Sequence, residues 1–170
     1  MTLYVPSTPE LGIQPIAQAA ATGTVNHPLG TIVDAYDATL GAGKFIYLYG
    51  VASNIVGALV TYNQLTGITT LAANTANQDK PLAVSMNANT SITTGSWYQV
   101  AGAAVITKTA VKVSPSVPLY LSGTAGRVMS TAASGKQVMN ATSINAATVA
   151  SATSTITVQL AYPFAQGAVA

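Results

Sequence analysis

The chain has 170 residues, of which 49% are hydrophobic and only 6% are charged. This length suits one domain that buries about 70% of its unfolded surface without cross-links. Because there is no cysteine and the net charge is only +2, the composition excludes disulfides and thiolate metal sites and argues against a nucleic-acid partner.

Residues 1–30 are predicted to form an extended N-terminal arm. They contain Pro6, Pro9, Pro15 and Pro28. Each proline removes a backbone donor and favours an extended residue before it. A short helix beginning at Pro15 is compatible with the Ala-rich stretch that follows. The arm is open to two interpretations, a disordered terminus or a docking segment, and its apolar composition favours docking.

We expect neither a targeting segment nor a membrane partner. The first ten residues, MTLYVPSTPE, lack the basic region and the apolar run of a signal peptide. No stretch of the chain approaches the roughly 20 apolar residues of a membrane-spanning helix.

Residues 31–170 are predicted to form an all-β domain, either a small antiparallel β-barrel or a sandwich. Short runs of β-favouring residues alternate with turns that contain glycine or proline, and no long helical pattern occurs. The expected strands are 31–36, 44–52, 58–62, 67–72, 81–86, 97–101, 103–108, 118–122, 127–130, 137–141 and 155–162. The Ala-, Ser- and Thr-rich segment 131–155 is compatible with either a loop or a flat edge strand.

The stretch GAGKFIYLYG at residues 41–50 combines two patterns. Its glycines and lysine resemble the end of a phosphate-binding loop, whereas residues 45–49 are typical of a strand buried on both faces. The loop would need a glycine at position 38 and a Ser or Thr at position 45, but Ala38 and Phe45 occupy them. The sequence therefore predicts a core strand, with Lys44 as a solvated residue at its end.

Few residues are capable of acid–base or metal chemistry. The acidic residues are Glu10, Asp34, Asp37 and Asp79, and the one histidine is His27. Asp37 precedes a turn that its own side chain is expected to cap. A catalytic pair of carboxylates needs a defined separation and tuned pKa values, which this pattern does not indicate. We therefore expect no enzymatic activity, no metal and no cofactor.

The single tryptophan and the eight tyrosines are expected mainly in the core or at interfaces. Half-buried aromatic residues of strands usually pack there, and a platform for nucleic-acid bases would need basic residues between them.

Three segments of the chain resemble a family of tailed-bacteriophage head decoration proteins, also called cement proteins. The first is HPLGTIVDAYDATLGAGKFIYLYGVAS, with a Leu-Gly pair, a short aspartate turn and a strand of the pattern G-x-G-[EK]-F-I-Y-L-x-G. The second is SWYQVAGAAVITKTAVKVSPSVPLYLSGTAGRVMS, with an aromatic strand, an Ala-Gly turn and an L-Y-x-S-x-x-A-G-x hairpin. The third is ITVQLAYPF. The resemblance covers roughly residues 28–163 and departs from the family at Lys44, where an acidic residue is expected.

The resemblance implies a structural protein of the virion, made in the host cytoplasm. It would decorate and stabilise the outer capsid surface as a homotrimer bound to the lattice of the major capsid protein. The residues then expected at the capsid or subunit interface are Tyr4, Val5, Leu11, Ile13 and Ile16. The alternative is a β-rich fibre or carbohydrate-binding module, in which the tyrosines and Trp97 would line an exposed groove.

Overall fold

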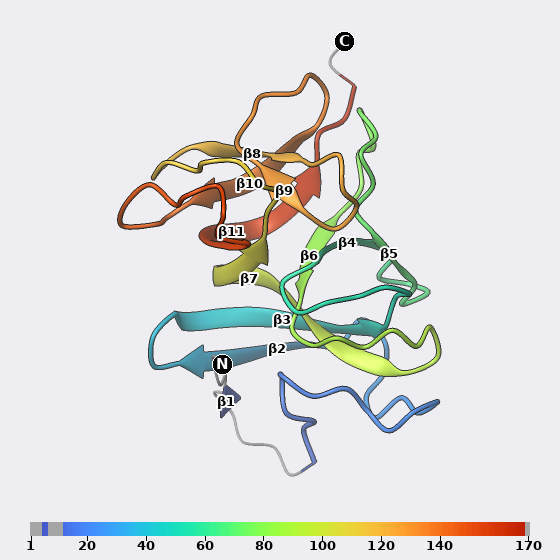
Figure 1. The fold of residues 1–170 in the computed structure, drawn as a ribbon. Coiled ribbons are helices and arrows are strands. Elements are labelled where there is room, and N and C mark those ends of the chain that lie inside the picture. Colours follow the sequence, from blue (N-terminus) through green and yellow to red (C-terminus); the bar gives the residue numbers. More distant parts are fainter. Residues whose placement is uncertain (1–4, 7–11, 169–170) are drawn as a thin grey trace.

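The computed structural model describes residues 5–6 and 12–168, and every regular element in this part of the chain is a β-strand (Figure 1). The strands are β1 (Val5–Pro6), β2 (Ile32–Asp37), β3 (Gly41–Tyr49), β4 (Leu59–Tyr62), β5 (Thr69–Leu71), β6 (Leu82–Ser85), β7 (Gly95–Thr107), β8 (Pro118–Leu121), β9 (Val128–Met129), β10 (Gln137–Ser143) and β11 (Thr155–Ala165). The named strands pair with one another in antiparallel fashion. The all-β, antiparallel prediction is therefore confirmed.

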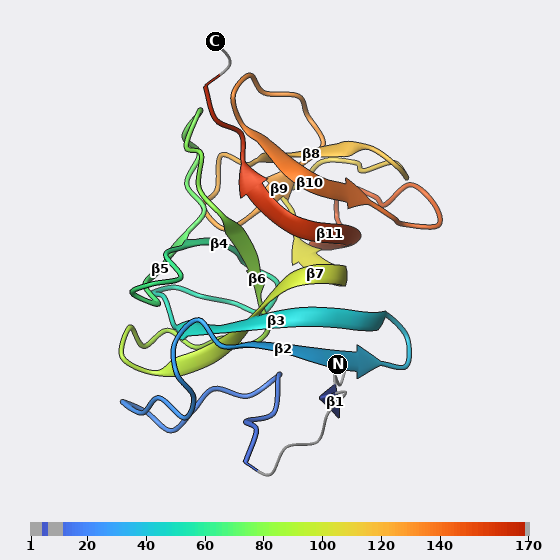
Figure 2. The same cartoon turned by 180° about the vertical axis from the view of Figure 1, so that it is seen from behind.

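The strands form one curled sheet with a branch. Its main order is β1-β2-β3-β7-β11-β10-β8-β9, and β4, β5 and β6 branch from β7 through β6. Figures 1 and 2 show β2 and β3 in the lower half of the molecule and β8–β11 in the upper half. The long strand β7 connects the halves, since it pairs with β3 through its first part and with β11 through its second.

Strand β7 replaces two shorter strands that the sequence predicts on either side of Gly102. The glycine does not end the strand, because it lies within β7 at a φ of 96°. The pairing with β3 shifts register between Lys44 and Phe45, close to this point. The two predicted strands are therefore one continuous strand with a bulge near Gly102, because glycine tolerates the positive φ that occurs there.

Strand β3 is buried on both faces, as its sequence predicts. Phe45 and Tyr47 pack into one apolar cluster with Trp97. Ile46 and Leu48 point to the opposite face and join a second cluster. Successive side chains of a strand alternate between its faces, so one strand supplies the centre of both clusters. A third and larger cluster is formed mainly by residues of β4, β6 and β7 together with those of β8–β11.

Residues 12–30 contain no regular strand or helix and are packed against the β domain. Ile16 is fully buried in the cluster of Phe45 and Trp97. The backbone is also tied to the sheet, because Ala20 N–H donates to Gly95 O at 3.0 Å and Gly30 N–H donates to Tyr47 O at 2.8 Å. Instead of a helix after Pro15 there is a single turn. This segment covers the lower face of the sheet (Figure 2).

The segment 131–155 contains an internal strand between two irregular parts, whereas its sequence is compatible with a loop or an edge strand. Strand β10 occupies residues 137–143, and the parts on either side of it are loops and turns. The strand lies between β8 and β11 and is therefore internal to the sheet, not an edge strand.

Candidate functional site

Lys44 lies on the surface of β3, directly opposite Asp34 of β2. Its Nζ is 2.7 Å from Oδ1 of Asp34, and the two side chains are 44% and 58% exposed. The hydrogen bond from Lys44 to Asp34 raises the pKa of the lysine. The lysine is solvated, as predicted, but it lies within the strand and has a carboxylate partner. The backbone after Lys44 continues as strand β3. Residues 41–50 therefore do not form the loop and helix that bind a phosphate in a phosphate-binding loop.

Asp37 caps its own turn, as its position in the sequence predicts. Its Oδ1 accepts hydrogen bonds from the backbone N–H groups of Thr39 at 2.8 Å and Leu40 at 2.9 Å. Among residues 5–6 and 12–168, no group of three or more His, Cys, Asp or Glu residues is placed to hold a metal ion. Asp37 therefore has a structural role in joining β2 to β3.

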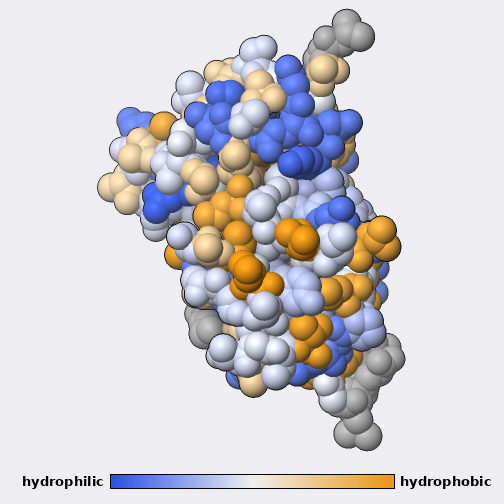
Figure 3. Space-filling view, turned by 90° about the vertical axis from the view of Figure 1, so that its right-hand side faces the viewer, coloured by the Kyte–Doolittle hydropathy of each residue, from blue (hydrophilic) through white to orange (hydrophobic). Residues whose placement is uncertain are grey.

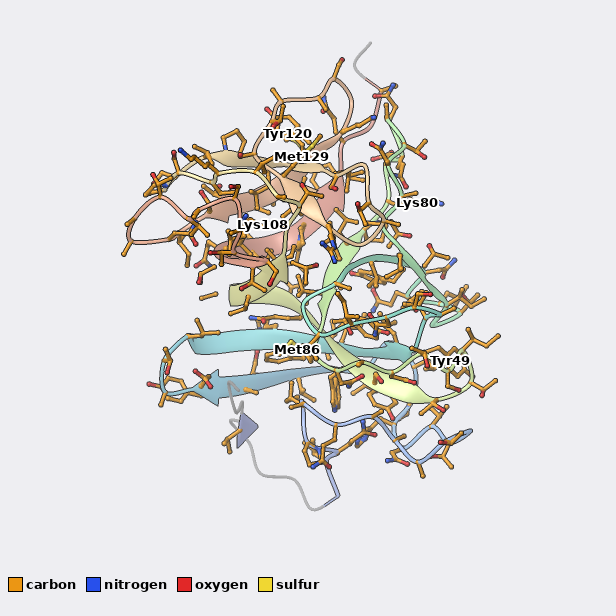
Figure 4. All side chains as sticks on the ribbon, in the orientation of Figure 1. Tyr49, Lys80, Met86, Lys108, Tyr120 and Met129 are labelled. Atoms are coloured by element: carbon orange, nitrogen blue, oxygen red, sulfur yellow. The ribbon has the colours of Figure 1, made fainter. Side chains whose placement is uncertain are left out.

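Lys108 is buried at the end of β7 in the upper half of the molecule (Figure 4). Its Nζ donates to the carbonyl oxygens of Val111 at 2.8 Å and of Thr109 and Ser151 at 3.3 Å each. Burial lowers the pKa of this lysine. Because its donors are directed at backbone oxygens of two loops, Lys108 connects those loops to the sheet and is not presented to a substrate.

Four of the ten large aromatic side chains among the described residues lie in the core, four are half-buried, and Tyr36 and Tyr162 are exposed. Trp97, Tyr47, Tyr98 and Phe45 are fully buried. Burial raises the pKa of Tyr98 to about 12. The described residues thus bring the single tryptophan together with core residues and do not place it in an exposed groove.

The five residues expected at an interface have different surroundings. Tyr4 and Leu11 lie outside the described residues. Val5 belongs to β1 and is exposed, and Ile13 is half-buried at the margin of the cluster around Trp97. Ile16 is fully buried against the chain's own core. It therefore anchors residues 12–30 to the domain and is not available to a partner, because its apolar surface is already covered.

An exposed apolar area surrounds the turn between β4 and β5. We call it the hairpin surface and define it by Tyr49, Tyr62, Leu65, Ile68 and Ile92. Leu65 is 93% exposed, Ile92 68% and Ile68 58%. These side chains border two hollows of about 580 and 400 Å³, which share Ile68 as a wall. Figure 3 shows the corresponding side of the molecule, where orange apolar areas lie below a strongly hydrophilic upper part.

The sequence of the turn explains why Leu65 is presented to solvent. Asn63 Oδ1 accepts hydrogen bonds from the N–H groups of Leu65 at 2.9 Å and Thr66 at 3.2 Å. Gly67 then closes the hairpin at a φ of 70°, and its N–H donates to Asn63 O at 2.8 Å. An asparagine that bonds the backbone two residues later fixes a tight turn. The leucine between these two residues is left at the tip without neighbours.

The hairpin surface carries little charge. Lys80 is the one charged residue among those that line the two hollows. Figure 4 shows Lys80 and Tyr49 on the same side of the molecule, with Lys80 above Tyr49.

The hairpin surface could have been predicted from apolar residues within turn segments of the sequence. These are Leu65 in NQLTG and Ile92 in NTSITTG. The alternation of residues along the strands does not indicate this surface.

Comparisons of the chain with models of known protein families, with curated protein sequences and with solved structures found no match. Within residues 5–6 and 12–168, no helix has the length and apolar character that crossing a bilayer requires. The function is therefore inferred from the surface described above and from the resemblance of the three sequence segments.

Proposed function

We propose that this chain is a structural virion protein that decorates the outside of a tailed-bacteriophage capsid. It binds the lattice of the major capsid protein and stabilises the shell through the added contacts. The observation that carries the proposal is the hairpin surface, where three large aliphatic side chains are more than half exposed on an all-β domain. Contiguous apolar surface of this kind is typical of a protein–protein contact.

The scarcity of charge supports the same proposal. Charged residues make up 6% of the chain, against about 25% in an average soluble domain. The centres of protein–protein interfaces are depleted of charged residues, because each charge loses its hydration when a partner covers it. A surface with few charges is therefore suited to being covered by a lattice of capsid subunits.

The three segments that resemble decoration proteins contribute neighbouring strands of the sheet. The first segment contains β3, the second contains β7, and the third lies in β11. These three strands are consecutive in the sheet order. The segments also contain β2, β8 and β9, so the resemblance covers the centre of the sheet and strands on both sides of it. It supports the function by analogy of fold only.

The alternative function is a fibre or carbohydrate-binding module. One observation favours it: Tyr62 is half-buried beside the larger hollow, together with the amide side chains of Asn63 and Gln64. Sugars stack on aromatic faces and bond to amides. Trp97 and Tyr47, which would be the main stacking residues, are however enclosed in the core. The capsid proposal is therefore favoured.

A co-sedimentation assay with undecorated capsids of the phage that encodes this chain tests the proposal. The wild-type chain is expected to sediment with the capsids. The variant Ile68→Asp is expected to bind more than tenfold more weakly, since it places a charge in the centre of the hairpin surface, where losing one anchor costs about 2 kcal/mol.

The matched control is Ile144→Asp. Ile144 is also exposed, but it begins the β10–β11 loop, which lies on the opposite side of the molecule from the β4–β5 hairpin in both ribbon views. This variant should bind as the wild type does. Equal binding by all three proteins would contradict the role of the hairpin surface, and failure of the wild type to bind would contradict the proposed function.

A further inference from the structure

A polar cluster joins residues 12–27 to the aromatic core in the lower half of the molecule. Its centre is Gln14, which is buried. The Gln14 carbonyl oxygen accepts the Trp97 Nε1–H at 2.9 Å, and its side-chain Oε1 accepts the Tyr47 hydroxyl at 2.8 Å. Its Nε2 donates to Gln18 O at 2.6 Å. The cluster therefore links this segment to both β3 and β7.

The backbone N–H of Gln14 makes a contact that depends on the protonation of His27. The Gln14 backbone N–H donates to Nε2 of His27 at 3.0 Å. An imidazole nitrogen accepts a hydrogen bond only when it carries no proton, so His27 is neutral in this arrangement, with its proton on Nδ1. Adding a proton to Nε2 would turn the acceptor into a second donor facing the Gln14 N–H.

The imidazole ring also packs against the two aromatic residues that Gln14 binds. Its centroid lies 5.0 Å from that of Tyr47, at a right angle, and 5.3 Å from that of Trp97. His27 itself is only half-buried. Solvent protons therefore have access to a ring that is part of the core packing.

We propose that His27 is a pH-sensitive latch: the neutral imidazole holds Gln14 and Asn26 in their hydrogen bonds to Trp97 and Tyr47, and its protonation breaks these contacts while Ile16 stays buried and the sheet stays folded. The proton comes from solvent and binds to Nε2, which then no longer accepts the Gln14 N–H. Release would remove the Gln14 carbonyl from the Trp97 Nε1–H and open this polar cluster to solvent.

The surroundings of His27 favour its neutral form. From β3 it contacts Tyr47. Burial raises the pKa of Tyr47, so its hydroxyl is neutral throughout the pH range in which histidine titrates. From β7 it meets Trp97, which does not titrate. Its own segment supplies Gln14 and Asn26, both uncharged. Among the described residues, no carboxylate contributes to the shift of the His27 pKa, which is lowered by burial.

The sign of the pH effect follows from this lowered pKa. The pKa of His27 in the unfolded chain is about 6.5, and that of the latched form is lower. The latch is therefore fully stabilised above pH 6.5 and loses its stability as the pH falls through the pKa of the latched form. Other side chains interfere little, because the sequence holds one histidine and four acidic residues.

The fluorescence of Trp97 tests the latch directly, since it is the single tryptophan of the chain. We expect its emission to shift to longer wavelength between about pH 8 and about pH 4, with a midpoint below 6.5, while the circular dichroism of the β-sheet stays unchanged over that transition. In the variant His27→Gln, whose side-chain oxygen can still accept the Gln14 N–H at any pH, the shift should be absent.

A second measurement does not depend on the variant folding correctly. Proton NMR of the single imidazole in the wild-type chain gives the pKa of His27, and hydrogen exchange reports the protection of the amides of Gln14 and Asn26, which bond to His27 Nε2 and to the Tyr47 hydroxyl. We expect protection of these amides to be lost at the pH where the imidazole titrates. Amides that remain protected below the measured pKa, or a fluorescence shift that persists unchanged in His27→Gln, would overturn the latch.

Discussion

Among the described residues, most buried polar side chains are satisfied by backbone groups and by other uncharged side chains, and three buried amide atoms have no partner: Asn54 Oδ1, Asn87 Nδ2 and Asn145 Nδ2. Asn89 Nδ2 donates to Thr94 O and to Ser96 Oγ, each at 2.7 Å. A hydrogen bond between neutral groups satisfies a buried donor without the desolvation cost of an ion pair. This explains how a chain with so few charges orders its long loops.

The burial of β3 leads to a prediction for two nearby residues. Ile46→Asp should abolish folding, because an unpaired carboxylate in the core costs an amount comparable with the total stability of a domain, about 5–15 kcal/mol. Lys44→Ala should leave the unfolding midpoint close to that of the wild type, since Lys44 contacts Asp34 in an exposed pair.

Thermal unfolding of both variants, with and without ATP and Mg²⁺, checks this prediction. Neither nucleotide nor metal should alter the wild-type midpoint. Stabilisation of the wild type by ATP that disappears in Lys44→Ala would mean that residues 41–50 bind a phosphate after all.

At the scale of single elements, β7 depends on a glycine that both close packing and backbone conformation make necessary. A Cβ at Gly102 would collide with the carbonyl oxygen of Ala42 and would lie 2.9 Å from the Cα of Gly43. Gly102 also has a φ of 96°. Strand β3 therefore approaches β7 so closely at this bulge that no side chain fits between them.

Gly102→Ala is expected to lower the free energy of unfolding by about 3 kcal/mol or more, since it combines backbone strain with a collision between two central strands. Gly41→Ala is the matched control, because Gly41 has a φ of 78° but a Cβ added there would meet no described atom within 4 Å. This control should cost about 1–2 kcal/mol from backbone strain alone. Urea denaturation measures both, and equal costs would contradict the close approach.

Residues 12–30 are a second element whose contribution can be measured. Ile16→Ala should destabilise the domain by about 2–5 kcal/mol, because it removes a fully buried side chain from the cluster around Trp97. Val25→Ala, in the same segment but exposed, should change stability by no more than about 0.5 kcal/mol. Urea denaturation followed by tryptophan fluorescence gives both values. Similar small effects for the two variants would show that the segment does not stabilise the domain.

At the scale of the whole molecule, the exposed apolar residues fall on more than one surface. Besides the hairpin surface, Ile32 and Tyr36 are exposed on the same face of β2. Under the proposed function, one apolar surface would contact the capsid and another a neighbouring subunit. Closed symmetric assemblies cover such surfaces, and they are the common form of soluble oligomers.

We therefore predict that the purified chain is an oligomer, most simply the homotrimer that its resemblance to decoration proteins implies. Light scattering at micromolar concentration should give about three times the chain mass of 17.1 kDa. The mass of a single chain under these conditions would contradict the assembly.

Local patterns in the sequence were sufficient to predict the β class, the two-sided burial of residues 45–49 and the turn capped by Asp37. Each depends on interactions within a few residues: the alternation of side chains along a strand, the conformations that glycine and proline allow, and a carboxylate that reaches the next backbone N–H groups. Such interactions are present in any short segment of the chain, so they can be recognised without its tertiary structure.

The position of Ile16, the continuity of β7 through Gly102 and the exposure of Leu65 depended on the tertiary structure. Ile16 is buried because Phe45 and Trp97, far along the chain, form a cluster that accepts it. Leu65 is equally apolar but has no such neighbours at the tip of its hairpin. Whether an apolar side chain anchors a segment or is left for a partner is decided by the residues that the fold brings beside it, because burial is a property of neighbours in space.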